Sequence, residues 1–358
     1  MSPAAYAVLD LDALQHNLAK VREYAPDAKV MAVIKANAYG HGLSRVATAL
    51  QGVDVFAVAR VDEAIRLRQD GLRTRIAVLE GFSCSEELHE ILHYRLEAVI
   101  HTQHQLTLLK AVNTSKSFIA WLKLDTGMNR LGFDAEMFDQ AYQQLRESEV
   151  IEKPINLMTH LANADDQEDT KTLAQIELFH QTVKKYSGEL SIANSAGVLG
   201  WSESLADWVR PGLMLFGVSP FAEKTGVEFG LRQVMSLHSR IIATKQIKLG
   251  DTVGYGSQWQ CQKPTLLGVV AIGYGDGYPR QTRQETPVLV NGVRVPLIGR
   301  VSMDMITVDL SNCPDAQPGD PVLLWGKDLP VEEIAACANT IPYTLLCGIT
   351  QRVQIVEQ

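Results

Sequence analysis

The chain has 358 residues, which is long enough for about two domains with hydrophobic cores. Hydrophobic residues make up 46% of it and charged residues 21%, as in ordinary globular proteins. The net charge of −8 argues against a nucleic-acid partner, because binding a phosphate backbone requires basic surface. No apolar run approaches the roughly 18 residues of a membrane span, so the sequence also predicts no membrane partner.

Cysteine usage and the amino terminus indicate the compartment. The five cysteines are scattered and form no Cys-x-x-Cys pair, which is typical of reduced thiols. The first ten residues lack the basic region and apolar segment of a secretory signal. We therefore predict a cytoplasmic protein.

The first part of the chain alternates short apolar strands with amphipathic helices. Helical patterns include Val61–Asp70 and Thr172–Lys185. Eight strands alternating with helices predict an α/β fold, namely an eight-stranded parallel β/α barrel of the TIM type. The predicted strands are Val30–Ile34, Val55–Ala59, Ile76–Leu79, Ala98–Ile100, Phe118–Leu124, Ile155–Thr159, Leu190–Ala193 and Trp208–Arg210.

The pattern changes near Leu231, where β-rich runs with turn residues begin. Asn291-Gly292 between two β-branched runs predicts a hairpin, followed by a strand at Val322–Leu324 and a short helix at Val331–Cys337. We assign residues 1–230 to the barrel domain and residues 231–358 to a mostly antiparallel β domain, with residues 219–230 as the linker. Residues 1–10, with a candidate strand at Tyr6–Leu9, are a candidate addition to the carboxyl-terminal domain.

Lys35 directly follows the apolar run Val30–Ile34 and precedes a loop with two glycines. Such barrels carry their chemistry at the carboxyl ends of the strands. Burial there would lower the pKa of the lysine and free its amine for Schiff-base formation. The residues alone leave a second interpretation open, in which the lysine simply reaches into water.

Two short motifs suggest other chemistry. His89-Glu90-Ile91-Leu92-His93 fits a zinc-protease pattern, but its apolar residues form the stripe of an ordinary amphipathic helix and no third histidine follows at the required spacing. Asp125-Thr126-Gly127 matches the aspartic-protease triplet, although the barrel pattern does not fit such an enzyme. We predict neither a protease nor a metal site.

The segment after the first barrel strand carries a family resemblance. Ile34–Gly42 reads Ile-Lys-Ala-Asn-Ala-Tyr-Gly-His-Gly and resembles the cofactor-lysine segment of bacterial alanine racemases, which hold pyridoxal 5′-phosphate (PLP). The resemblance implies that Lys35 carries PLP as an internal aldimine and that Tyr39 lies near the phosphate.

A second segment, Trp121–Gly132, resembles the same family through a lysine, Asp-Thr-Gly-Met, an arginine and Leu-Gly. The resemblance implies that Lys123 is a candidate for carbamylation and that Arg130 contacts the substrate carboxylate. An arginine fork suits a carboxylate well, and a carbamate would be an anion able to hold the arginine. A plain salt bridge at Lys123 remains an open alternative.

Further cofactor contacts follow from the same resemblance. Arg210 would face the pyridine nitrogen, and because guanidinium stays protonated it would keep that nitrogen from becoming pyridinium. Ser195 would bind the phosphate together with the backbone amides of Gly212 and Leu213. The remaining cofactor-binding positions implied are His160 and Tyr343.

The carboxyl-terminal domain resembles the family as well. Val253–Gly256 matches the segment with the second catalytic base, which would be Tyr255, while Tyr274 and Met303 would line the path of the substrate. Racemisation needs an acid/base on each face of one carbon, so Lys35 and Tyr255 would share the work. The resemblance implies a homodimer with shared active sites that interconverts L- and D-alanine, for peptidoglycan or for catabolism. A PLP-dependent decarboxylase and a non-catalytic PLP-binding regulatory barrel are the alternatives.

Overall fold

The structure, a computed structural model, describes residues 4–358. Contacts between residues divide this chain into two compact units. The barrel unit comprises Gln15–Leu215, and the β unit comprises Phe216–Gln358 together with the described residues up to Leu14. The first helix, α1 (Leu11–Tyr24), contains the dividing point. The domain limits at residues 230 and 231 stay a prediction.

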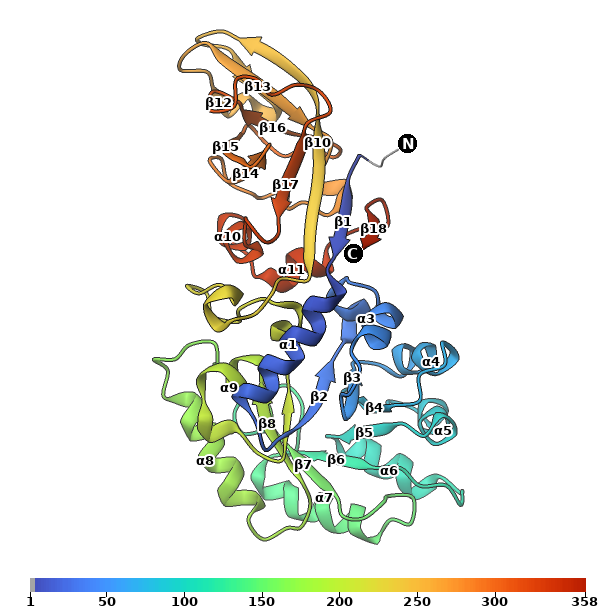
Figure 1. Ribbon diagram of the computed structural model, residues 1–358. Coiled ribbons are helices and arrows are strands. Elements are labelled where there is room, and N and C mark those ends of the chain that lie inside the picture. Colours follow the sequence, from blue (N-terminus) through green and yellow to red (C-terminus); the bar gives the residue numbers. More distant parts are fainter. Residues whose placement is uncertain (1–3) are drawn as a thin grey trace. The chain divides into compact units, whose positions relative to one another are not determined.

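The barrel unit is a closed ring of parallel strands (Figure 1). Each strand pairs with the next, and the last closes the ring by pairing Trp208 with Lys29 and Val209 with Val30. The strands are β2 (Lys29–Val33), β3 (Val55–Val58), β4 (Arg75–Val78), β5 (Glu97–Ile100), β6 (Ala120–Lys123), β7 (Asn156–Met158), β8 (Leu190–Asn194) and β9 (Trp208–Arg210). The predicted eight-stranded barrel is therefore confirmed. The predicted strand 118–124 is shorter than expected, because Phe118 and Leu124 form only isolated bridges.

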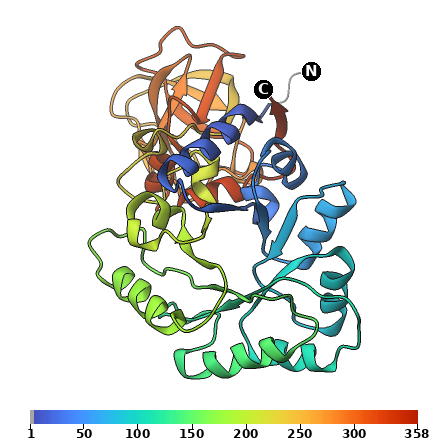
Figure 2. The same ribbon diagram turned by 60° about the horizontal axis from the view of Figure 1, so that its bottom comes forward.

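Helices connect the strands and lie outside them, as both ribbon views show (Figure 2). They are amphipathic: in α8 the buried side chains are Thr172, Gln175, Ile176, Phe179 and Val183, which follow the helical repeat. The helices of this unit beyond α1 are α2 (Lys35–Tyr39), α3 (Leu43–Ala49), α4 (Val61–Gln69), α5 (Ser85–Tyr94), α6 (Gln103–Ala111), α7 (Ala135–Glu147), α8 (Lys171–Val183) and α9 (Ser195–Gly200), with short turns η1 (Ser202–Ser204) and η2 (Leu213–Phe216).

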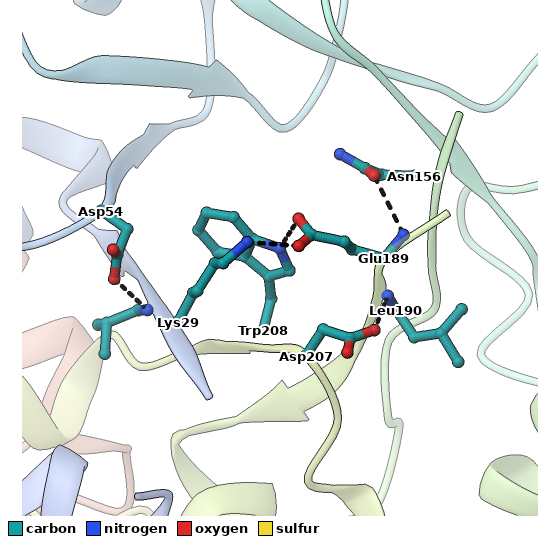
Figure 3. Close-up of polar contacts among 8 residues, drawn as sticks. Lys29, Asp54, Asn156, Glu189, Leu190, Asp207 and Trp208 are labelled. Carbon is teal, nitrogen blue, oxygen red and sulfur yellow. Dashed lines mark hydrogen bonds and ion pairs between the residues drawn. The ribbon is translucent and has the colours of Figure 1, made fainter. Parts of the chain in front are cut away.

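Two tryptophans and their charged partners close the amino-terminal end of the barrel. Trp208 donates its indole N–H to Glu189 at 2.6 Å, and Glu189 also pairs with Lys29 (Figure 3). Trp121 packs edge-on against Trp208 and donates to the buried Glu97 at 2.8 Å. In parallel barrels this end supports stability, whereas chemistry belongs to the opposite end.

The β unit is a mostly antiparallel sheet, as predicted. Its strand order is β13-β16-β15-β14-β17-β10-β1-β18, and β13 also pairs with β10. The amino-terminal strand β1 pairs with β10 and β18, so the candidate strand Tyr6–Leu9 forms. The strands are β1 (Tyr6–Leu9), β10 (Met235–Ile247), β11 (Thr252–Val253), β12 (Trp259–Gln260), β13 (Thr265–Val270), β14 (Pro287–Val290), β15 (Val293–Ile298), β16 (Ile306–Asp309), β17 (Pro321–Trp325) and β18 (Gln354–Glu357).

Local signals of the β unit also agree with the sequence. Asn291 and Gly292 have φ of 51° and 79° and turn β14 into β15, which is the geometry that favours an Asn-Gly hairpin. The predicted helix at 331–337 is present. The helical segments of this unit are η3 (Gly226–Phe229), η4 (Tyr255–Ser257), η5 (Tyr274–Asp276), α10 (Val331–Cys337) and α11 (Pro342–Cys347).

Two properties of residues 4–358 concern membranes and metals. No helix there is long and apolar enough to cross a membrane. Within the same residues no group of three His, Cys, Asp or Glu side chains could hold a metal ion. In the His89–His93 motif, His89 donates to the carbonyl of Ser85 at 2.7 Å and the ring of His93 lies against Tyr94.

Candidate active site

Lys35 stands at the carboxyl end of β2, where the chain makes an unusual turn. Ala36, Asn37, Ala38 and Tyr39 have φ between 52° and 54°, so four consecutive non-glycine residues are left-handed. Hydrogen bonds hold the turn, among them Ala38 N–H to the Ile34 carbonyl at 2.9 Å and Gly42 N–H to the Asn37 carbonyl at 2.9 Å. Left-handed backbone costs roughly 1–2 kcal/mol per residue, so the fold must fix this turn.

Lys123 ends β6, and a tight loop then leads to Arg130. Asp125 organises this loop by accepting the N–H groups of Gly127 at 2.9 Å and Asn129 at 3.1 Å. Gly132 has φ of 131°, and a side chain there would lie 2.7 Å from the nitrogen of Asp125, so only glycine fits. The Asp125-Thr126-Gly127 triplet thus serves the loop's structure.

Arg210 ends β9 and is 5% exposed. Its guanidinium donates to the Ser191 hydroxyl and the Thr159 carbonyl, each at 2.5 Å. It also donates to the Ile192 carbonyl at 3.2 Å and approaches Nδ1 of His160 at 3.3 Å. Burial lowers the pKa of Arg210 to about 10, which leaves it charged at neutral pH.

His160 follows β7 and is kept neutral by its surroundings. Its pKa lies well below the ordinary value, first because it is buried and then because Arg210, Lys123 and other cations are near. An arginine can only donate, so Nδ1 of His160 accepts from Arg210 and the ring proton resides on Nε2. His160, which the sequence predicts as a cofactor-binding residue, is thus a neutral imidazole that can accept and donate hydrogen bonds.

Positive charge accumulates at this end of the barrel. The pKa of Lys123 falls to about 8, because its side chain is 8% exposed and because Arg210, Arg130 and Lys35 repel its ammonium more than Asp125 attracts it. Lys35, Lys123, Arg130, His160 and Arg210 therefore form one electrostatic cluster, from four different strand ends. Such a cluster suits an anionic ligand.

A small polar cradle adjoins this cluster. Ser195, 4% exposed, accepts the N–H groups of Gly212 at 3.0 Å and Met214 at 3.3 Å, so its hydroxyl proton can be donated elsewhere. A side chain at Gly212 would lie 2.4 Å from the hydroxyl of Tyr39. The structure therefore brings Tyr39, Ser195 and Gly212 together, with Leu213 between the two amides. Hydroxyls and amides of this kind fit a phosphate group.

Four predicted site residues belong to the β unit. Tyr255, Met303 and Tyr274 are respectively 70%, 52% and 38% exposed, and Tyr343 in α11 is half-buried. Two backbone hydrogen bonds join the segments of Tyr274 and Met303, from Tyr274 N–H to Ser302 at 3.0 Å and from Gly275 N–H to Met303 at 2.8 Å. Arg352 pairs with Asp276 at 3.1 Å and Asp304 at 2.8 Å and so fastens both segments.

A buried polar network around Gln175 was not predicted from the sequence. Gln175 accepts the Ala162 N–H at 2.9 Å and donates to the Thr126 hydroxyl at 3.1 Å and the His160 carbonyl at 3.3 Å. Thr126 in turn bonds the hydroxyl of Thr159 at 2.8 Å. The available signal was a glutamine on the apolar stripe of α8, since a buried amide requires polar partners.

Comparisons with known proteins agree along the chain. Residues 9–220 match the family model "Alanine racemase, N-terminal domain", and residues 234–357 match "Alanine racemase, C-terminal domain". The chain belongs to the alanine racemase family. An alanine racemase of Coxiella burnetii is 50% identical over 99% of this chain and 98% of its own length.

Solved structures of the alanine racemase family have the same fold. The biosynthetic alanine racemase from Pseudomonas aeruginosa is 41% identical, with a TM-score of 0.97 and complete coverage of both chains. Alanine racemase from Bartonella henselae, solved with covalently bound pyridoxal phosphate, is 29% identical with a TM-score of 0.89, again with complete coverage of both chains. These relatives support a racemase over the decarboxylase alternative, and the second family model covers the β unit that a regulatory barrel would lack.

Proposed function

We propose that this protein interconverts L- and D-alanine with PLP as its cofactor. The observation that carries the proposal is the group of cations at the carboxyl end of the barrel, which comprises Lys35, Lys123, Arg130 and Arg210 and of which Lys123 and Arg210 are buried. PLP carries an anionic phosphate, which suits the cluster and the cradle of Tyr39, Ser195 and Gly212. The names of the relatives supply the substrate.

Several residues of the barrel unit and Tyr343 of the β unit would each bind a different part of the cofactor. Lys35 would hold PLP covalently, Tyr39, Ser195 and the Gly212 and Leu213 amides would bind its phosphate with Tyr343, and Arg210 would donate to its pyridine nitrogen. When bound, PLP withdraws electrons from the α-carbon of an amino acid and so acidifies its hydrogen. Arg210 would limit that withdrawal because it donates a hydrogen bond to the pyridine nitrogen but keeps its proton. The limit favours simple reprotonation of the α-carbon over side reactions.

Two bases would act on opposite faces of the α-carbon, because a single group returns the proton to the face it left. Lys35 Nζ would move the proton on one face and the hydroxyl of Tyr255 on the other. Arg130 would hold the substrate carboxylate with its guanidinium fork. The backbone of Met303 would approach the same carboxylate, while the side chains of Met303 and Tyr274 line the path of the substrate.

Lys123 would be carbamylated. A pKa of about 8 leaves about a tenth of its amines neutral at pH 7, compared with less than about a thousandth for an ordinary lysine. Neutral amines are the form that reacts with CO₂. The resulting carbamate would replace a cation with an anion among Arg210, Arg130 and Lys35, which relieves their repulsion and holds Arg130 in place.

The active sites would be shared across a homodimer. The side chain of Tyr255 on the β unit is 70% exposed, which is unusual for a large side chain that would act in catalysis. Met303 of the same unit is exposed as well. Covering such residues by a second chain would exclude water from the reaction. A two-fold dimer would bring the β unit of each chain to the barrel of the other.

Purified holoprotein incubated with L-alanine tests the activity. Enantiomers have equal free energies, so the account predicts equal amounts of D- and L-alanine by chiral chromatography at equilibrium. Release of CO₂ with formation of ethylamine would support the decarboxylase instead. Binding of PLP without any change in alanine would support the regulatory barrel. D-Alanine from this reaction would serve peptidoglycan synthesis, or the reaction would serve alanine breakdown. The protein would act in the cytoplasm, where its five cysteines stay reduced.

A further inference from the structure

The left-handed turn after Lys35 needs an anchor. Three of its four residues, Ala36, Ala38 and Tyr39, have side chains that disfavour positive φ, so four left-handed residues in a row are not an intrinsic preference of the chain. Ala36 and Asn37 are exposed, so hydrogen bonds rather than side-chain packing hold the first half of the turn, and one of these runs from the Leu43 N–H to the side chain of Asn37 at 3.0 Å. The hydrogen bonds made by the first residues of the turn therefore decide where the backbone of Lys35 points.

Glu63 of α4 supplies such a bond. One of its carboxylate oxygens accepts the N–H of Ala36 at 2.7 Å. The other oxygen accepts the N–H of Ala59 at 2.9 Å and of Arg60 at 3.3 Å, where β3 passes into α4. A single carboxylate thus joins the residue after Lys35 to the neighbouring strand and helix. Hydrogen bonds from N–H groups to a carboxylate are stronger than those between neutral groups.

Glu87 occupies the same place in α5 as Glu63 does in α4 and provides a comparison. Glu87 is the third residue of α5, as Glu63 is the third residue of α4. Glu87 accepts the N–H of Ser83 at 2.6 Å and the hydroxyl of Ser83 at 2.8 Å, both from the loop before its own helix. Glu63 differs because one oxygen leaves its own loop and reaches Ala36.

We propose that Glu63 is a positioning residue for Lys35, which it serves by fixing the N–H of Ala36 and with it the left-handed turn. The proposal rests on the proposed function, in which Lys35 holds the cofactor and moves a proton. The carboxylate of Glu63 accepts from the backbone N–H groups of Ala36, Ala59 and Arg60, so it would act through the backbone. Its effect comes from the direction of the Lys35 side chain, because small displacements of a reacting group slow a reaction strongly.

Glu63→Gln is the main test, because its single, uncharged acceptor oxygen cannot serve the N–H groups of Ala36 and Ala59 at once, and a bond to Ala36 that it kept would lose the strength given by the charge. Glu87→Gln is the matched control, and Glu63→Asp keeps the charge but shortens the reach. In the protein without cofactor, hydrogen exchange at the Ala36 amide should accelerate about tenfold or more in Glu63→Gln and stay unchanged in Glu87→Gln. Unchanged exchange at Ala36 in Glu63→Gln would overturn the proposal.

In the holoenzyme, Glu63→Gln should lower kcat by about tenfold to a hundredfold, with KM for alanine within about twofold of wild type. Glu87→Gln should cost less stability to urea than Glu63→Gln, since Glu87 accepts both of its bonds on one oxygen, which glutamine retains, whereas Glu63 uses both oxygens. Equal losses of kcat in the two variants would show a general structural effect and contradict the proposal. If Glu63→Gln fails to fold, Glu63→Asp is held to the same two readouts. The exchange measurement does not depend on turnover, so it separates a failure of this proposal from a failure of the proposed function.

Discussion

Lys123→Met should stabilise the protein without cofactor against unfolding. It should also remove the stabilisation that CO₂ gives to wild type. The pKa of Lys123 falls from 10.5 to about 8, mainly through burial and then through repulsion by Arg210 and Arg130. This difference corresponds to a penalty of about 3 kcal/mol on the charged side chain. The side chain is 8% exposed, so solvent screens little of that penalty. Methionine keeps the length of the apolar stem and removes the charge.

The pH dependence follows from the sign of the shift. Because the folded state lowers the pKa, the penalty is complete below pH 8 and disappears as the pH rises towards 10.5. In CO₂-free buffer at pH 7, Lys123→Met should therefore gain up to about 3 kcal/mol over wild type, and the gain should shrink between pH 8 and 10.5.

Urea denaturation followed by tryptophan fluorescence measures this difference, and Lys110→Met, at an exposed position of α6, is the control for loss of a lysine. Added bicarbonate should stabilise wild type and leave Lys123→Met unchanged. A less stable Lys123→Met in CO₂-free buffer, or a bicarbonate effect that survives the substitution, would refute the reasoning.

Two further predictions concern the cradle and the closed end of the barrel. Gly212→Ala should weaken PLP binding by about tenfold or more in a spectroscopic titration, because its methyl group would lie 2.4 Å from the Tyr39 hydroxyl; unchanged affinity would count against the cradle. Glu97→Ala should lower stability by about 2 kcal/mol with an unchanged KM for alanine, because it leaves the buried N–H of Trp121 without its acceptor. Glu189→Ala should cost less, since the side chain of Glu189 is 37% exposed; an equal or greater loss would contradict this explanation.

Much of the fold could be predicted because its signals are local. Most barrel strands contain a short apolar run, since parallel strands are buried on both faces. The Asn291-Gly292 turn is equally local, because its two positive φ angles select those residues. Most of the barrel site residues follow strand ends in the sequence, and a barrel gathers its strand ends at one edge.

The features that escaped prediction depend on contacts between distant residues. In the left-handed turn at 36–39 only Asn37 is of a type that tolerates positive φ, and the carboxylate of Glu63 that accepts the Ala36 N–H comes from another helix. Residues 219–230 read as a linker by composition, yet the N–H groups of Ser219 and Gly226 both donate to Glu332, at 2.9 Å, within the β unit. Gln175 reaches the barrel loops from α8. No local pattern encodes such pairings.

Complementation between two inactive variants tests the shared two-base site most directly. Lys35→Ala and Tyr255→Phe chains are mixed, and subunit exchange is confirmed by mass before activity is measured. If Tyr255 acts on the barrel of the partner chain, each hybrid dimer contains one site with both bases intact. Random pairing should then recover about a quarter of wild-type racemase activity, because half of the dimers are hybrids with one good site of two. A mixture that exchanges subunits and stays inactive would contradict the shared site.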